Sequence, residues 1–164
     1  MHQSISLSVQ LGYRLACVSR FALRSLRTRS ARGAIGLRDE RLLQKTEFPT
    51  VRTFAQQATH VAEANYFFAS LISGVKPDVD TKAFEKLTSK DDVVAALAGS
   101  FAFSHKAVAT LTPENAWVVI KSPEPGFATH ATMAAFLVAH ANDHYGQMVE
   151  YLRMNAIVPP ASAR

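Results

Sequence analysis

The chain has 164 residues, of which 48% are apolar and 19% charged, a composition that predicts one globular domain with a sizeable core. Its net charge of +5 is concentrated at one end. Residues 1–38 contain seven arginines and no acidic residue, so the other 126 residues sum to −2. Because no nucleic-acid-binding motif follows this basic segment, we expect no nucleic-acid partner.

Membrane insertion and disulfide formation are not expected either. No apolar run approaches the roughly 18 residues that span a bilayer. The single cysteine, Cys17, cannot form an internal disulfide, so nothing indicates an oxidising compartment. We therefore expect a cytoplasmic protein that does not enter a membrane.

Residues 1–38 form a basic segment whose Arg- and Ser-rich composition is shared by organelle transit peptides and by sequences with an upstream start or a frame error. An apolar stripe nevertheless recurs there at helical spacing: Leu11, Leu15, Val18, Ala22 and Leu26. We predict an atypical first helix at about 10–29 and, after two glycines, a loop over 37–52. The helical bundle should occupy residues 39–160, with a tail at 161–164.

A second helix should start near Thr53 and run to Ser73. Thr53 and Gln56 have the spacing of a capping box, and Gly74 marks the end of the helix. Its buried stripe is predicted to be Phe54, Ala58, Val61, Asn65, Phe68 and Ile72. His60 borders this stripe, and on its own it is more simply explained as an edge histidine with a local hydrogen-bond partner.

A third helix is predicted from a cap at Ser89 to about Leu111, after a loop over 74–88 that includes a turn around Phe84. Its stripe is Val94, Leu97, Phe101, Ser104, Val108 and Leu111, and His105 lies beside it. Residues 112–128 contain three prolines and should form a long irregular connection. We expect Trp117, within that connection, to pack on the end of the bundle.

The last helix, predicted from Thr129 to Asn155, carries two histidines on its apolar stripe: Met133, Phe136, Leu137, His140, His144, Met148, Tyr151 and Leu152. Residues four apart on a helix are neighbours, so His140 and His144 can both face one metal ion. The residues between them are Ala, Asn and Asp, which excludes the zinc-protease motif because its catalytic glutamate is missing. Burying unpaired imidazole nitrogens costs on the order of 1–3 kcal/mol each, which favours a shared partner.

These helices predict an all-α four-helix bundle with longer connections after the second and third helices. The second and last helices must bury their stripes in one core, so His60 can meet the pair His140 and His144. We predict a metal site made by these three histidines, with His105 as a candidate fourth ligand. His2 and His130 are predicted to lie too far away. Polar side chains that could orient ligands are Asn142, Asp143, Gln147 and Tyr66.

Two segments, VRTFAQQATHVAEANYFF from Val51 and AHANDHYGQMVEYLRMNAIVPP from Ala139, resemble the DinB-like (DinB/YfiT) superfamily of small four-helix bundles. The resemblance covers residues from about Val51 to Pro160. It implies that His60, His140 and His144 bind a divalent metal ion, usually nickel or zinc.

The resemblance also suggests a function, because some members of this superfamily are thiol S-transferases that use a low-molecular-weight thiol. We therefore expect a divalent-metal-binding protein that is a metal-dependent thiol transferase. The alternatives are a non-catalytic metal-binding stress-response bundle and a structural interaction module without metal. A homodimer is expected from the resemblance and from the many apolar residues of the second and third helices, among them Phe67, Phe68, Phe101 and Phe103.

Overall fold

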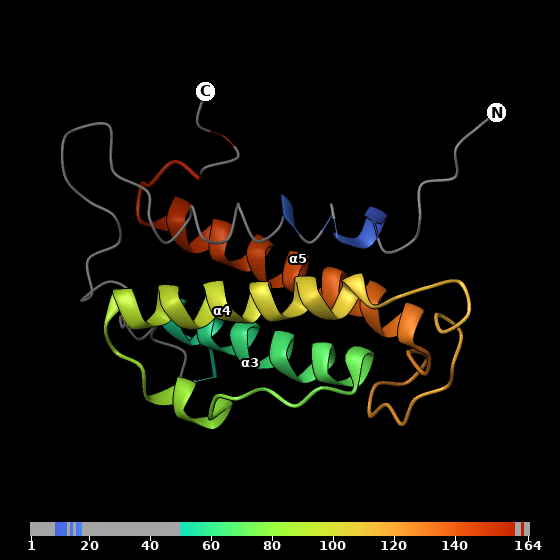
Figure 1. Ribbon diagram of the computed structural model, residues 1–164. Helices are drawn as coiled ribbons and strands as arrows, with labels where there is room; N and C mark the ends of the chain where they lie inside the picture. The colour runs from blue at the N-terminus through green and yellow to red at the C-terminus, as the bar shows by residue number, and fades with distance from the viewer. Residues whose placement is uncertain (1–8, 13, 15, 18–49, 160–161, 163–164) are drawn as a thin grey trace.

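The computed structural model describes residues 9–12, 14, 16–17, 50–159 and 162 (Figure 1). Its long helices are α3 (Phe54–Ser73), α4 (Lys90–Ala109) and α5 (His130–Met154), and the short 3₁₀-helix η1 (Thr81–Lys86) precedes α4. The described residues between 9 and 17 are also helical. The predicted all-α bundle is confirmed, although residues 18–49, including most of the predicted first helix and its following loop, lie outside the described part.

Capping boxes define the N-terminal ends of α3 and α5, and a glycine cap defines the C-terminal end of α3. The Thr53 side chain accepts from the Gln56 backbone N–H, and the Gln56 side chain accepts from the Thr53 backbone N–H. Thr129 and Thr132 form the corresponding box at the start of α5. At the other end of α3, Gly74 has φ 71°, a left-handed conformation that glycine adopts without a steric penalty. The predicted limits of α3 are therefore confirmed, whereas α4 ends two residues before the predicted Leu111.

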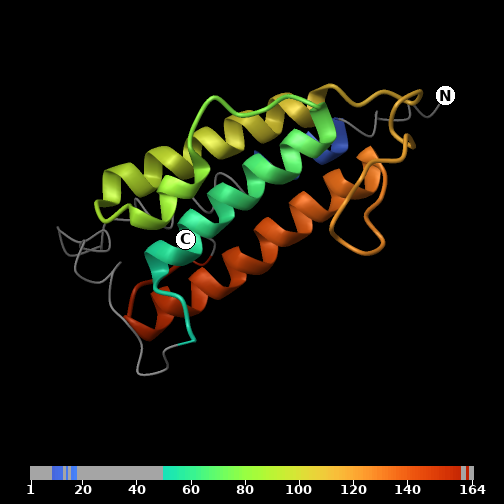
Figure 2. The same ribbon diagram turned by 90° about the horizontal axis from the view of Figure 1, so that it is seen from below.

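The connection between α3 and α4 crosses the length of the bundle, so these two helices run parallel, and α5 runs antiparallel to both (Figures 1 and 2). Helix α3 lies in the middle, where it packs against α4, α5 and η1. The predicted turn around Phe84 is η1 itself. The connection between α4 and α5 is irregular, with an isolated bridge between Val119 and Thr129. This arrangement places one face of α3 directly opposite α5.

The core is built from the three predicted apolar stripes. All six predicted residues of α3 are buried, and all six of the third-helix stripe are buried as well. On α5 the most buried members are Met133, Leu137, Met148 and Leu152, each 0% exposed. Trp117 differs from the prediction: its side chain is 68% exposed, because the irregular connection holds it in solvent and away from the end of the bundle. No described helix is both long enough and apolar enough to cross a membrane.

Most of the aromatic residues from which a homodimer was predicted are buried or partly buried within a single chain. Phe68 and Phe101 are buried, Phe103 is partly buried, and Phe67 is 47% exposed. Only Phe67 of these four therefore presents a large apolar surface to solvent. The homodimer stays a prediction, and its sequence argument now depends on this one residue.

Leu11 tests whether the N-terminal segment belongs to the bundle. Its side chain is 8% exposed and belongs to the hydrophobic core. Replacing Leu11 with Ala should lower the free energy of unfolding by about 2–5 kcal/mol, because the substitution leaves a cavity. Val9→Ala is the matched control, since Val9 is 59% exposed and its truncation should be nearly neutral. Chemical denaturation of both variants measures the difference; equal, small effects would mean that the segment contributes nothing to the core.

Candidate metal centre

Three histidine side chains meet in the seam between α3 and α5. Helix α3 supplies His60, and α5 supplies His140 and His144 one turn apart. Their ring centroids are 4.5 Å apart for His140 and His144, 4.8 Å for His60 and His144, and 5.2 Å for His60 and His140. One ligand nitrogen from each ring lies within 4.8 Å of the other two. The three predicted site residues are therefore brought together.

The separation of the ring nitrogens is compatible with a single ion. Three nitrogens that bind one ion at about 2.0–2.1 Å in a tetrahedral arrangement lie about 3.4 Å from one another. The three nitrogens lie within 4.8 Å of one another, so the rings must close around an ion by up to about 1.4 Å to bind it. The cluster can hold one ion with three protein ligands.

A hydrogen bond between the two helices determines which nitrogen of His144 is available. His144 Nδ1 lies 2.8 Å from Gln57 Oε1. An amide oxygen can only accept, so Nδ1 carries the proton and donates it. The lone pair of neutral His144 is then on Nε2. Gln57 thereby fixes the tautomer that a metal ligand requires.

Gln57 is itself held by a chain of side-chain hydrogen bonds that ends on a carboxylate. Gln57 Nε2 donates to Gln147 Oε1 at 2.7 Å, and Gln147 Nε2 donates to Asp143 Oδ2 at 2.8 Å. Each amide has one oxygen and one NH₂ group, so the direction of donation is the same along the chain. The carboxylate at its end favours the orientation in which Gln57 presents its oxygen to His144.

His140 is the candidate ligand whose ring has a buried nitrogen, Nδ1, without a hydrogen-bond partner among the described residues. Its ring is surrounded by Phe68, Phe136 and the other two histidines. An orphaned buried nitrogen costs on the order of 1–3 kcal/mol unless a ligand satisfies it. The residues present therefore fit a metal ion.

The electrostatic environment keeps the three imidazoles neutral. Burial is the main cause that lowers the pKa of His60 to about 4, and the positive charge of Arg52 acts in the same direction. Burial likewise lowers the pKa of His140 to about 4. Burial lowers the pKa of His144 too, while Asp143 opposes the shift. Neutral imidazoles are the form that binds metal, so the site is ready for an ion at neutral pH.

Only some of the other residues predicted to belong to the site lie near the three histidines. Asp143 and Gln147 belong to the hydrogen-bond chain, whereas Asn142 is exposed and donates to the Val138 carbonyl within its own helix. Tyr66 contacts Phe84 and Phe103, and its hydroxyl would lie 2.9 Å from a Cβ at Gly99, so it faces η1 and α4. Neither His105 nor His130 belongs to the three-histidine cluster. The prediction of His105 as a fourth ligand is wrong for this structure because α4 packs on the other side of α3.

Gln57 and Arg52 lie at the site but were not predicted from the sequence to contribute to it. Gln57 is 4% exposed, on the row of α3 that also carries His60. A long amide in an otherwise apolar row indicates a buried polar partner, and that partner is His144. Arg52 precedes the helix and gave no periodic pattern from which its direction could be predicted.

Replacing Gln57 should weaken metal binding without removing a ligand. Gln57→Leu deletes the acceptor for His144 Nδ1, and loss of such a partner typically costs about 10–100-fold in metal affinity. Gln57→Glu is the control, because a carboxylate can still accept from Nδ1. Competition titrations with a chelator of known affinity would measure both variants. An unchanged affinity in Gln57→Leu would contradict the role assigned to this hydrogen bond.

The lowered pKa values also predict how the metal-free protein responds to acid. Between pH 6.5 and about 4 the unfolded chain protonates His60 and His140, whereas the folded chain keeps them neutral. The unfolded state then binds more protons, so stability falls as the pH is lowered through this window. Urea denaturation at pH 6.5, 5.5 and 4.5 should show the loss, and His140→Gln should reduce its slope. The same slope in both proteins would rule out His140 as a contributor.

Comparisons with known proteins agree with this architecture. A sequence model described as the DinB superfamily matches residues 22–148. The match therefore begins earlier than the expected residue Val51 and includes His60, His140 and His144. No curated protein matches the chain. A family match over more than half of the sequence, together with the all-α bundle and the clustered histidines, establishes that the chain belongs to the DinB superfamily.

Proposed function

We propose that the three histidines bind one divalent ion and that the protein is a metal-dependent transferase, which adds a small thiol to an electrophilic substrate. The observation that carries the proposal is the convergence of His60, His140 and His144 with one nitrogen each available. A set of three protein ligands is typical of catalytic sites, which keep one coordination position open, whereas structural zinc sites usually have four.

Three neutral histidine ligands are suited to an ion that activates a thiol. When bound by the three histidines, a divalent ion would lower the pKa of a coordinating thiol, and the thiolate is the reactive form. Neutral imidazoles would add no negative charge to the ion, and the Gln57 chain holds His144 in the required tautomer. The thiol proton leaves to solvent, the sulfur forms a bond to an electrophilic carbon, and the leaving group departs with its electron pair. Nickel and zinc are the metals that we expect.

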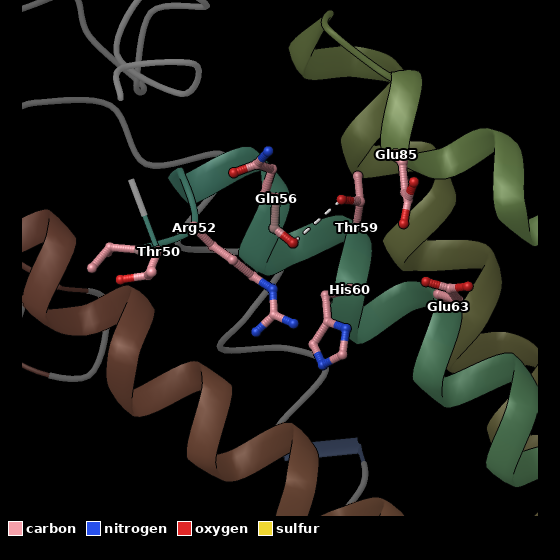
Figure 3. A pocket seen from close by; sticks show the side chains of 8 residues that line it. Thr50, Arg52, Gln56, Thr59, His60, Glu63 and Glu85 are labelled. Atoms are coloured by element: carbon pink, nitrogen blue, oxygen red, sulfur yellow. Dashed lines mark hydrogen bonds between the residues drawn. The ribbon is translucent and has the colours of Figure 1, made fainter. Parts of the chain in front are cut away.

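A cavity next to His60 provides space for reactants. It has a volume of about 420 Å³ and is lined by residues that include Arg52, Thr59, His60 and Glu63 (Figure 3). Small-molecule sites commonly measure about 300–1,000 Å³, so a small thiol and part of a substrate fit. Cys17 is not required, because the thiol comes from a separate molecule.

A turnover assay tests the proposal directly. Metal-loaded protein should accelerate the reaction of a chromogenic electrophile with at least one member of a panel of small thiols. The activity should disappear on chelation, return with added metal and be absent from His60→Ala. His105→Ala is the matched control and should keep its activity, since His105 lies outside the cluster. Background rates for the whole panel, with metal demonstrably bound, would contradict the transferase and favour a non-catalytic metal-binding bundle.

A further inference from the structure

The cavity beside His60 has an uneven charge distribution. Figure 3 shows the Arg52 guanidinium pointing toward the His60 ring, with the carboxylates of Glu63 and Glu85 on the other side of that ring. Arg52 forms no ion pair with any carboxylate among the described residues. The cavity therefore has a positive end next to His60 and an acidic end farther along α3.

Contacts with α5 and with the start of α3 fix the backbone at Arg52. The Tyr151 hydroxyl of α5 donates a hydrogen bond to the Arg52 backbone carbonyl. The next residue, Thr53, is the buried N-cap of α3. The backbone at Arg52 is thus tied to both helices that carry the histidines. Its side chain, which is exposed to the cavity, has no described partner that would hold it elsewhere.

Arg52 places a positive charge beside a centre that would itself hold a divalent cation. Neutral His60, His140 and His144 leave the two positive charges of a divalent ion uncompensated, and Arg52 acts on all three rings as a further positive charge. Asp143 supplies one nearby negative charge to His140 and His144. Glu63 and Glu85 line the cavity on the other side of His60, so the end of the cavity at Arg52 would keep a local excess of positive charge when an ion is bound. An anionic ligand between the ion and Arg52 would lower this excess of positive charge.

We propose that the cavity binds a ligand with an anionic group, such as a carboxylate, which pairs with Arg52 while another atom of the same ligand occupies the open position of the three-histidine centre. The planar guanidinium suits a carboxylate because it can donate two parallel hydrogen bonds. The acidic side chains Glu63 and Glu85 disfavour the anionic group at the opposite end, so the ligand has one orientation. This inference rests on the proposed metal site and specifies the class of thiol or substrate that it accepts.

Two thiols that differ only in charge provide the test. The probes are 3-mercaptopropionate and its neutral analogue 3-mercaptopropionamide, titrated into cobalt-loaded protein and followed by the thiolate-to-cobalt absorption. The acid should bind about tenfold more tightly than the amide, because its carboxylate forms charged hydrogen bonds with Arg52. In Arg52→Gln this ratio should fall to near one. The substitution keeps the backbone carbonyl that Tyr151 binds, so folding should be preserved.

Lys106→Gln is the control for loss of one positive charge, since Lys106 is exposed in the last turn of α4, at the opposite end of the bundle. It should keep the tenfold preference for the acid. If cobalt binds and both thiols give the absorption, an equal affinity for the two, or an unchanged ratio in Arg52→Gln, overturns this inference and leaves the metal site intact. Failure of cobalt to bind at all overturns both proposals.

Discussion

The hydrogen bond from His144 Nδ1 to Gln57 Oε1 is the interaction on which the centre depends. It joins α3 to α5, and both residues are buried, with 6% and 4% of their surface exposed. Inside a protein such a bond is costly to break because either partner would be left without a substitute from water. The same bond settles the tautomer of His144. One contact therefore both joins the two helices and orients a candidate metal ligand.

The topology explains why these groups meet there. Because the connection after α3 crosses the bundle, α4 lies parallel to α3 on one side and leaves the other side to α5. Gln57 and His60 are three residues apart on α3, and His144 and Gln147 are three apart on α5, so each pair shares a face of its helix. The antiparallel packing brings these two faces together. The cavity then lies along α3 next to His60, where η1 contributes Glu85.

Much of this was predictable from residues whose position on a helix is set by local chemistry. The capping box of Thr53 and Gln56 and the glycine at position 74 fix α3, which in turn fixes the face of His60. His140 and His144 occupied apolar positions four residues apart, a spacing that lets both rings face one metal ion. Packing depends on periodicity, and the periodicity of all three long helices was clear. Hence the all-α fold and the convergence of the three histidines were predictable from the sequence.

The remaining features depend on contacts that periodicity does not encode. Gln57 was visible as a polar residue in a buried row, but its pairing with His144 requires the register between α3 and α5. Arg52 precedes the first turn of α3, and its backbone carbonyl accepts a hydrogen bond from Tyr151, which is 99 residues away in sequence. Trp117 lies in an irregular connection whose path no repeating pattern constrains. His105 was close to a buried stripe, yet α4 faces a different side of α3.

Metal content is the most direct measure of whether the three histidines act together. Protein purified without a histidine tag and analysed for its elements should contain about one divalent ion per chain, and His144→Ala should contain almost none. His105→Ala, which removes a histidine outside the cluster, should match the wild type. Wild-type protein that takes up no divalent ion after incubation and dialysis, or a His144→Ala variant that binds as much as the wild type, would contradict the account.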